Sequence, residues 1–215
     1  MAAYVNSYEM TDLSLDKQNA ILKTVEDVLG GNGIKIESLA YQKKTATSYG
    51  VARSRDKKIE VEIQKTFLSN PAKKQDEQSA LWGKQKAENI AKFTAYVNDP
   101  KRHGILDYNQ RQLAWWSKAP RWSTFQDAGN PIDAVVRHEL YHAVDFTNEI
   151  KTGFKLSDRL VAELDAAGVD RSDWALVSSY GESKPTELFA ELGAAIDAHL
   201  DVPQVFVDAF RKVVP

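Results

Sequence analysis

The amino-acid sequence predicts an α+β fold, in which the strands are gathered in one part of the chain and the helices occupy the rest. Three strand-like segments follow one another between residues 34 and 67, and residues 59–63 alternate between apolar and charged side chains, as a strand with one solvent-exposed face does. Apolar residues recur at helical spacing over residues 14–29, 76–98 and 130–147. Strands in one run and helices in others are typical of α+β proteins.

Length and composition place the chain among ordinary globular proteins. It has 215 residues, 43% of them hydrophobic and 27% charged, which fits one fairly large domain or a compact domain with an appendage. We expect no membrane span, because no apolar run approaches the required length of about 20 residues. No secretory signal pattern is visible, which leaves the location open between the cytoplasm and export or packaging by a non-classical route, as in a toxin or phage particle. The absence of cysteine excludes disulfides and thiolate ligands.

The N-terminal part is expected to hold the sheet. Residues 14–29 form a predicted helix that ends at the glycines of residues 30–33, and the predicted strands are 34–42, 45–53 and 59–67. Lysines and arginines are frequent between residues 43 and 58. We interpret them as the solvated surface of a sheet edge rather than as a phosphate-binding ribbon, and expect no nucleic-acid partner.

The middle of the chain is expected to be a linker followed by a long helix. Residues 71–77 are polar and begin with proline, 76–98 have helical spacing, and 103–108 suggest a short strand. His103 is expected to face solvent rather than to bind a ligand. A tryptophan-rich segment follows, with Trp115, Trp116, Trp122 and Phe125. Packing of a connecting segment is the favoured interpretation, and an aromatic wall for substrate is the alternative.

Residues 130–147 carry the strongest functional signal. Asn130 is a good helix N-cap and Pro131 suits the first helical position. His138 and His142 stand one turn apart, so both imidazoles can reach one ion, while Glu139 is offset around the helix and can act on a metal-bound water. This His-Glu-x-x-His arrangement is that of zinc peptidases.

A catalytic zinc needs a third protein ligand and an open position for water. Position 148, which is histidine in one branch of these enzymes, is asparagine here. Residues 183–191 predict the start of a later helix, on which Glu187 and Glu191 lie one turn apart. We assign Glu187 as the ligand and Glu191 as the residue that orients an imidazole, with the reverse as the alternative. Asp145 is a second candidate for orienting an imidazole.

His138-Glu139-x-x-His142, then Tyr180, then Glu187-x-x-x-Glu191 resembles the catalytic domain of the anthrax lethal factor-like zinc peptidases, which belong to the gluzincin type. The resemblance covers about residues 130–195. It implies a zincin fold, with a small, twisted, mostly antiparallel sheet on the active-site helix and a helical C-terminal lobe. It also implies that Tyr180 faces the metal and stabilises an oxyanion or donates a proton.

We therefore expect a single zincin-like domain over residues 1–215. Residues 1–129 would form a helix-and-sheet lobe with an inserted long helix, and 130–215 the active-site helix and helical lobe. The expected activity is zinc-dependent hydrolysis of a protein or peptide substrate, with one zinc ion and with Glu139 as general base. The alternatives are a non-catalytic zincin-like domain of a toxin or phage particle, and a peptidase that processes only its own precursor. The sequence does not predict the oligomeric state.

Overall fold

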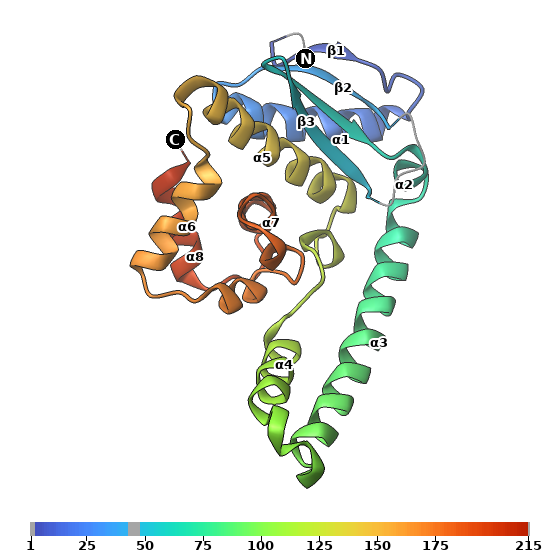
Figure 1. Ribbon diagram of the computed structural model, residues 1–215. Helices are drawn as coiled ribbons and strands as arrows, with labels where there is room; N and C mark the ends of the chain where they lie inside the picture. The colour runs from blue at the N-terminus through green and yellow to red at the C-terminus, as the bar shows by residue number, and fades with distance from the viewer. Residues whose placement is uncertain (1–2, 43–47, 215) are drawn as a thin grey trace.

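The computed structural model describes residues 3–42 and 48–214 and confirms an α+β fold (Figure 1). Lys43 and Lys44, and the beginning of the predicted strand 45–53, lie outside the described residues. The sheet has four strands, which are β1 (Val5–Tyr8), β2 (Ile36–Tyr41), β3 (Gly50–Arg55) and β4 (Lys58–Ile63). Their order is β1-β2-β4-β3, so that β1 and β3 form the two edges of the described sheet.

The expectation of a mostly antiparallel sheet is wrong. β1 pairs with β2 and β2 with β4 in parallel, and only β3 and β4 are antiparallel. The cause is α1 (Leu15–Val25), which η1 (Glu26–Gly30) prolongs, because this helix carries the chain back across the sheet between β1 and β2. β3 and β4 are joined by Asp56 and Lys57, both with positive φ, which is the geometry of a tight type I′ hairpin.

A long helical hairpin projects from the body of the molecule (Figure 1). After the short α2 (Lys65–Ser69), it consists of α3 (Pro71–Val97), η2 (Pro100–Ile105) and α4 (Leu106–Lys118), which we call the helical arm. Residues 71–77, predicted as a linker, are helical because Asn70 caps α3 by accepting a hydrogen bond from the Lys73 N–H, with Pro71 in the first turn. The predicted strand 103–108 is also helical. The side chain of His103 lies outside the described residues.

The remaining helices pack around the helix that carries the two histidines. η3 (Thr124–Gln126) leads into α5 (Pro131–Thr152), which lies between the sheet and a helical lobe (Figure 1). This lobe contains α6 (Leu156–Ala166), η4 (Arg171–Leu176), η5 (Gly181–Ser183), α7 (Pro185–Asp197) and α8 (Gln204–Val213).

One cluster of buried apolar side chains extends from the sheet through α5 to α8. Val136 and Leu140 of α5 are fully buried in it, as the four-residue spacing predicts. Within residues 3–42 and 48–214, no helix combines the length and the apolar character that crossing a membrane requires. The core therefore fixes α5 in the middle of the molecule, with its two histidines between the sheet and the lobe.

Candidate metal centre

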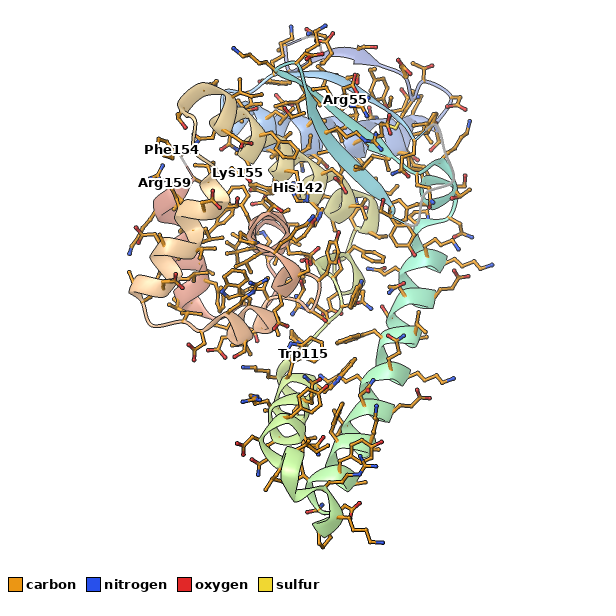
Figure 2. All side chains as sticks on the ribbon, viewed as in Figure 1. Arg55, Trp115, His142, Phe154, Lys155 and Arg159 are labelled. Atoms are coloured by element: carbon orange, nitrogen blue, oxygen red, sulfur yellow. The ribbon has the colours of Figure 1, made fainter. Side chains whose placement is uncertain are left out.

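α5 holds two imidazoles side by side. Asn130 caps the helix by accepting hydrogen bonds from the N–H groups of Ile132 and Asp133, at 3.1 and 3.3 Å. His138 and His142 follow on one face, and their Nε2 atoms lie 3.1 Å apart. Figure 2 shows His142 on the side of α5 that faces α7. Both side chains are largely buried, so they are held in place by packing.

α7 brings a carboxylate to the same point. Oε2 of Glu187 lies 3.2 Å from Nε2 of His138 and 3.1 Å from Nε2 of His142. The other oxygen, Oε1, lies 3.1 Å from Nζ of Lys184 and is thereby turned away from the imidazoles. Glu187 is only 5% exposed, although it lies in the first turn of its helix. The structure thus supplies a third donor atom from a separate helix.

The three donor atoms form a nearly equilateral triangle with edges of 3.1–3.2 Å. A tetrahedral zinc ion with bonds of 2.0–2.1 Å separates neighbouring donors by about 3.3 Å, so the triangle fits one face of such a tetrahedron. Among the described residues, the group that could hold a metal ion consists of His138, His142 and Glu187. Two nitrogens and one oxygen would leave a fourth position open.

Charge is concentrated at this cluster. Burial by itself would lower the pKa of His138, but the carboxylates of Glu187 and Glu191 outweigh it and raise the pKa well above its usual value. Burial would raise the pKa of Glu187, but hydrogen bonds to the two imidazoles hold it well below the usual range. A positive charge is therefore favoured between these groups. A divalent cation would supply it while leaving the imidazoles neutral, as ligation requires.

Glu191 lies beside the ring nitrogen of His138 that faces away from the metal cluster. Its Oε1 lies 2.9 Å from Nδ1 of His138 and accepts a hydrogen bond from the Ser123 hydroxyl at 2.8 Å. Its Oε2 accepts from the Thr124 N–H at 2.6 Å and from the Thr124 hydroxyl at 2.7 Å. Glu191 is 1% exposed, and these donors from the start of η3 satisfy its buried carboxylate. No sequence pattern pointed to Ser123 or Thr124 as site residues.

Glu139 lies on the sheet side of the cluster, against β3. It is buried, and its carboxylate accepts a hydrogen bond from the backbone N–H of Ala52. Burial raises the pKa of Glu139 above its usual value. A Cβ atom built on Gly50 would lie 2.6 Å from Cγ of Glu139, so only glycine allows β3 to approach this side chain. A glycine within a predicted strand, as Gly50 is, was the available sequence signal for this close approach.

Tyr180, a further predicted site residue, lies next to His138. Its backbone N–H donates to the carbonyl of Trp122 at 2.8 Å, and its ring centroid lies 5.9 Å from that of His138. Burial, followed by the charge of Glu187, raises the pKa of Tyr180 well above its usual value. The phenol is therefore protonated near neutral pH and can donate a hydrogen bond.

Asp145 does not orient an imidazole in this structure. Its Oδ1 accepts the N–H of Ser157 at 2.9 Å, and its Oδ2 accepts the Ser157 hydroxyl at 2.8 Å. Asp145 lies nearly one turn beyond His142 on α5, and that offset turns it toward the start of α6. Its role is to satisfy the first turn of α6.

The tryptophan-rich segment divides between packing and the site. Trp115 and Trp116 pack on Trp82 of α3, with ring centroids 6.4 and 5.3 Å from it, as the favoured interpretation predicted. Trp122 also packs on Trp82, at 5.9 Å between ring centroids, and Phe125 is buried, but both in addition line a cavity of about 340 Å³ that reaches His138 and Glu139.

Comparison of the chain with known protein families, with curated proteins and with solved structures found no match. The assignment of function therefore depends on the geometry of the site.

Proposed function

We propose that the chain is a zinc-dependent endopeptidase with a zincin-like fold, similar to the anthrax lethal factor-like catalytic domains. The observation that carries the proposal is the convergence of His138, His142 and Glu187 within 3.2 Å of one another, with the buried carboxylate of Glu139 beside them. A structural metal site would need neither this carboxylate nor an open position.

Zinc is the metal that this donor set suits best. Two imidazole nitrogens and one carboxylate oxygen are a common ligand set of catalytic zinc. A bound zinc ion would polarise the scissile carbonyl and lower the pKa of a water at the open position. The histidines and Glu187 would hold the ion, and Glu191 would fix the ring of His138 from the opposite nitrogen.

Glu139 is the proposed general base. Its carboxylate takes a proton from the attacking water as the new C–O bond forms, and gives that proton to the amine nitrogen as the C–N bond breaks. A pKa raised by burial favours both steps, since a more basic carboxylate accepts the proton more readily and its acid is still strong enough to protonate an amine.

Tyr180 is proposed to donate a hydrogen bond to the oxyanion that develops on the carbonyl oxygen. Its raised pKa keeps the phenol protonated. Loss of one such donor costs about 10²–10³-fold in rate in enzymes that form a comparable oxyanion.

β3 is the proposed binding edge for an extended peptide. Gln64 N–H donates to the Tyr49 carbonyl at 2.8 Å, so residues 49, 51 and 53 hydrogen-bond to β4. The backbone groups of the alternate residues Gly50, Ala52 and Ser54 consequently point away from β4, and the Ala52 N–H among them donates to Glu139. β3 is an edge strand that lies against α5 at Glu139, so an added peptide strand would pass the metal cluster.

Glu139→Gln tests the proposal. We expect hydrolysis of a mixed peptide library to be abolished while zinc content, measured by atomic emission, stays near one ion per chain. His142→Ala should lose the metal itself, and a chelator should inactivate the native chain. Glu149→Gln, an exposed position on the same helix, is the matched control and should leave activity unchanged. Full activity of Glu139→Gln would contradict the assignment of the base.

A further inference from the structure

The base of the helical arm is packed against the helical lobe by a second, smaller core. Trp82 of α3, Ala119 at the end of α4 and Ala175 of η4 are buried together, and Trp115 and Trp116 pack against them. Figure 2 shows Trp115 at the end of α4 that lies nearest the body of the molecule. The arm therefore contacts the lobe at its base.

Trp115 makes a further contact with the lobe. Its indole N–H donates a hydrogen bond to the carboxylate of Glu182, which lies in η5. Both residues are half-buried, and a hydrogen bond to a charged acceptor is stronger than one between neutral groups. The neighbouring Trp116 contacts the rings of Trp82 and Trp115, and no acceptor for its indole N–H lies among the residues that the structure describes. The hydrogen bond to η5 thus distinguishes two adjacent tryptophans of α4.

Glu182 lies two residues after Tyr180, in the turn that directly follows the phenol. The Tyr180 N–H donates to the Trp122 carbonyl at 2.8 Å, which fixes the backbone before the turn. η5 itself has three residues, and so short a 3₁₀ turn has little stability of its own. Its last carbonyl accepts from Arg171 at 3.1 Å, but that contact is exposed to solvent. The hydrogen bond from Trp115 is therefore the shielded contact that joins η5 to a helix distant in the sequence.

Ring contacts also connect the base of the arm to Tyr180. The ring of Tyr180 contacts those of Trp122 and His138, with centroids 6.0 and 5.9 Å away. Trp122 in turn lies 5.9 Å from Trp82, measured between ring centroids. Tyr180 is thus placed both by the ring of Trp122 and by the turn that contains Glu182. A displacement of that turn would change where the phenol oxygen lies relative to His138.

We propose that Trp115 of the helical arm is a positioning residue for Tyr180, which acts by hydrogen-bonding Glu182 and so holds η5 and the phenol in place beside the metal cluster. The proposal rests on the proposed peptidase function, in which Tyr180 donates to the oxyanion. A displacement of about 1 Å in such a group can cost about 10²-fold in rate. Because the donor acts on the transition state, its displacement should lower kcat and leave KM nearly unchanged.

Substitutions at both ends of the hydrogen bond test this proposal. Trp115→Phe keeps an aromatic ring against Trp82 and removes the N–H donor. Glu182→Leu removes the acceptor at similar size, whereas Glu182→Gln keeps an oxygen that can accept. Trp116→Phe makes the same exchange as Trp115→Phe one residue further along α4 and leaves the hydrogen bond to Glu182 intact, so it is the matched control.

The first measurement is steady-state kinetics of the zinc-loaded chain on a peptide that it cleaves in a mixed library. We expect Trp115→Phe and Glu182→Leu each to lower kcat about tenfold with KM within about twofold of the native value, and Glu182→Gln to recover most of the loss. Trp116→Phe should resemble the native chain. In a Tyr180→Phe background, Trp115→Phe should cause no further loss, because the hydroxyl that it positions is absent. An equal loss in both backgrounds, or an equal loss in Trp116→Phe, would overturn the proposal.

The second measurement does not depend on hydrolysis. A fluorinated tyrosine replaces Tyr180 in the zinc-loaded chain, and its fluorine resonance is recorded by NMR. We expect Glu182→Leu to shift or broaden this resonance and Glu182→Gln to restore it, although neither substitution alters a neighbouring aromatic ring. If the native chain cleaves nothing but the resonance responds in this way, the peptidase function fails and the positioning of Tyr180 stands. A resonance unchanged in both Trp115→Phe and Glu182→Leu overturns the positioning proposal.

Discussion

The approach of β3 to α5 depends on the absence of one side chain, that of Gly50. Gly50→Ala would add a methyl group 2.6 Å from Cγ of Glu139, and since neither strand nor helix can move freely, we expect the Glu139 carboxylate to leave the Ala52 N–H. Peptide hydrolysis should fall at least tenfold while zinc content is retained, because the nearest atoms to the added methyl group belong to Glu139 and not to His138, His142 or Glu187. Steady-state kinetics with metal analysis measure both.

Gly104→Ala is the control for this substitution, since a Cβ at Gly104 meets no atom within 4 Å. If Gly50→Ala were as active as Gly104→Ala, the packing of Gly50 against Glu139 would have no part in placing the base.

Thr124 acts on the metal cluster through Glu191. Thr124→Val removes the hydroxyl that lies 2.7 Å from Oε2 of Glu191 and keeps the side-chain shape and the backbone N–H. Glu191 then loses one hydrogen bond and fixes the imidazole of His138 less tightly. We therefore expect zinc affinity to fall about tenfold, which is the low end of the losses that follow when a residue that orients a metal ligand is changed. Competition with a chromophoric chelator measures the affinity.

Thr147→Val provides the comparison for Thr124→Val, because the Thr147 hydroxyl donates to the Ala143 carbonyl of its own helix at 2.8 Å. Zinc affinity should be unchanged in this variant. A loss of affinity equal to that of Thr124→Val would show that the hydroxyl of Thr124 acts only on general stability.

For single residues, the sequence predicted which side chains come together at the metal cluster, but not which contacts hold them there. The spacing of His138 and His142 fixes their relation within one helix, and a carboxylate on a later helix was needed to complete the set. Thr124 acts across elements distant in sequence, so no local pattern reveals it, whereas Gly50 could have been noticed as a glycine within a predicted strand. Asp145 was misassigned because spacing along α5 does not show which neighbour a side chain faces, and here it faces Ser157.

Among the helices, α5 and α7 carry all three donors, and their separation is set at Gly193. A Cβ there would lie 2.5 Å from the ring of Tyr141 on α5, so Gly193→Ala must push the two helices apart. We expect a loss of about 1–3 kcal/mol in the free energy of unfolding, measured by urea denaturation, together with weaker zinc binding. Zinc binding should weaken because the three donor atoms move apart.

Gly83→Ala tests whether the loss of stability expected for Gly193→Ala comes from the contact with Tyr141 or from any exchange of glycine for alanine in a helix. Gly83 lies in the exposed middle of α3, where a Cβ meets no atom within 4 Å. Alanine should stabilise the chain there by about 0.5–1 kcal/mol, because alanine loses less backbone entropy than glycine in a helix. Stabilisation by Gly193→Ala as well would contradict the close crossing.

Elements with clear periodicity were predictable from sequence, and those shaped by tertiary contacts were not. The apolar spacing on α5 gave the helix and its buried side. β1 was missed because it has only four residues, and Asn6 and Ser7 between its ends are exposed. Without β1, the crossover through α1 could not be recognised, and the sheet was wrongly expected to be mostly antiparallel. α4 was missed because its tryptophans pack on α3, which local sequence does not show.

For the whole molecule, zinc should act as a clamp between two parts of the fold. α5 packs on the sheet and α7 belongs to the helical lobe, and the donor triangle joins them. A ligand that binds only the folded state stabilises it by about 4 kcal/mol at a concentration 1,000 times its dissociation constant. For a chain of this size, we expect zinc to raise the melting temperature by about 10 °C at neutral pH. Differential scanning calorimetry measures the rise.

The size of this rise should depend on pH, because protons and zinc compete for the same nitrogens. Without metal, the raised pKa of His138 contributes stability that is fully present below the unfolded value of about 6.5 and is lost as pH rises through the folded value. The lowered pKa of Glu187 contributes stability above about 4.3 that is lost on acidification. The metal-free chain is thus best stabilised by this cluster between these two values, where zinc must displace a proton to bind. We therefore expect the zinc-induced rise in melting temperature to be larger at pH 7.5 than at pH 5.5, and absent in His142→Ala at both. A rise that is equal at the two pH values would mean that zinc binds away from the imidazoles.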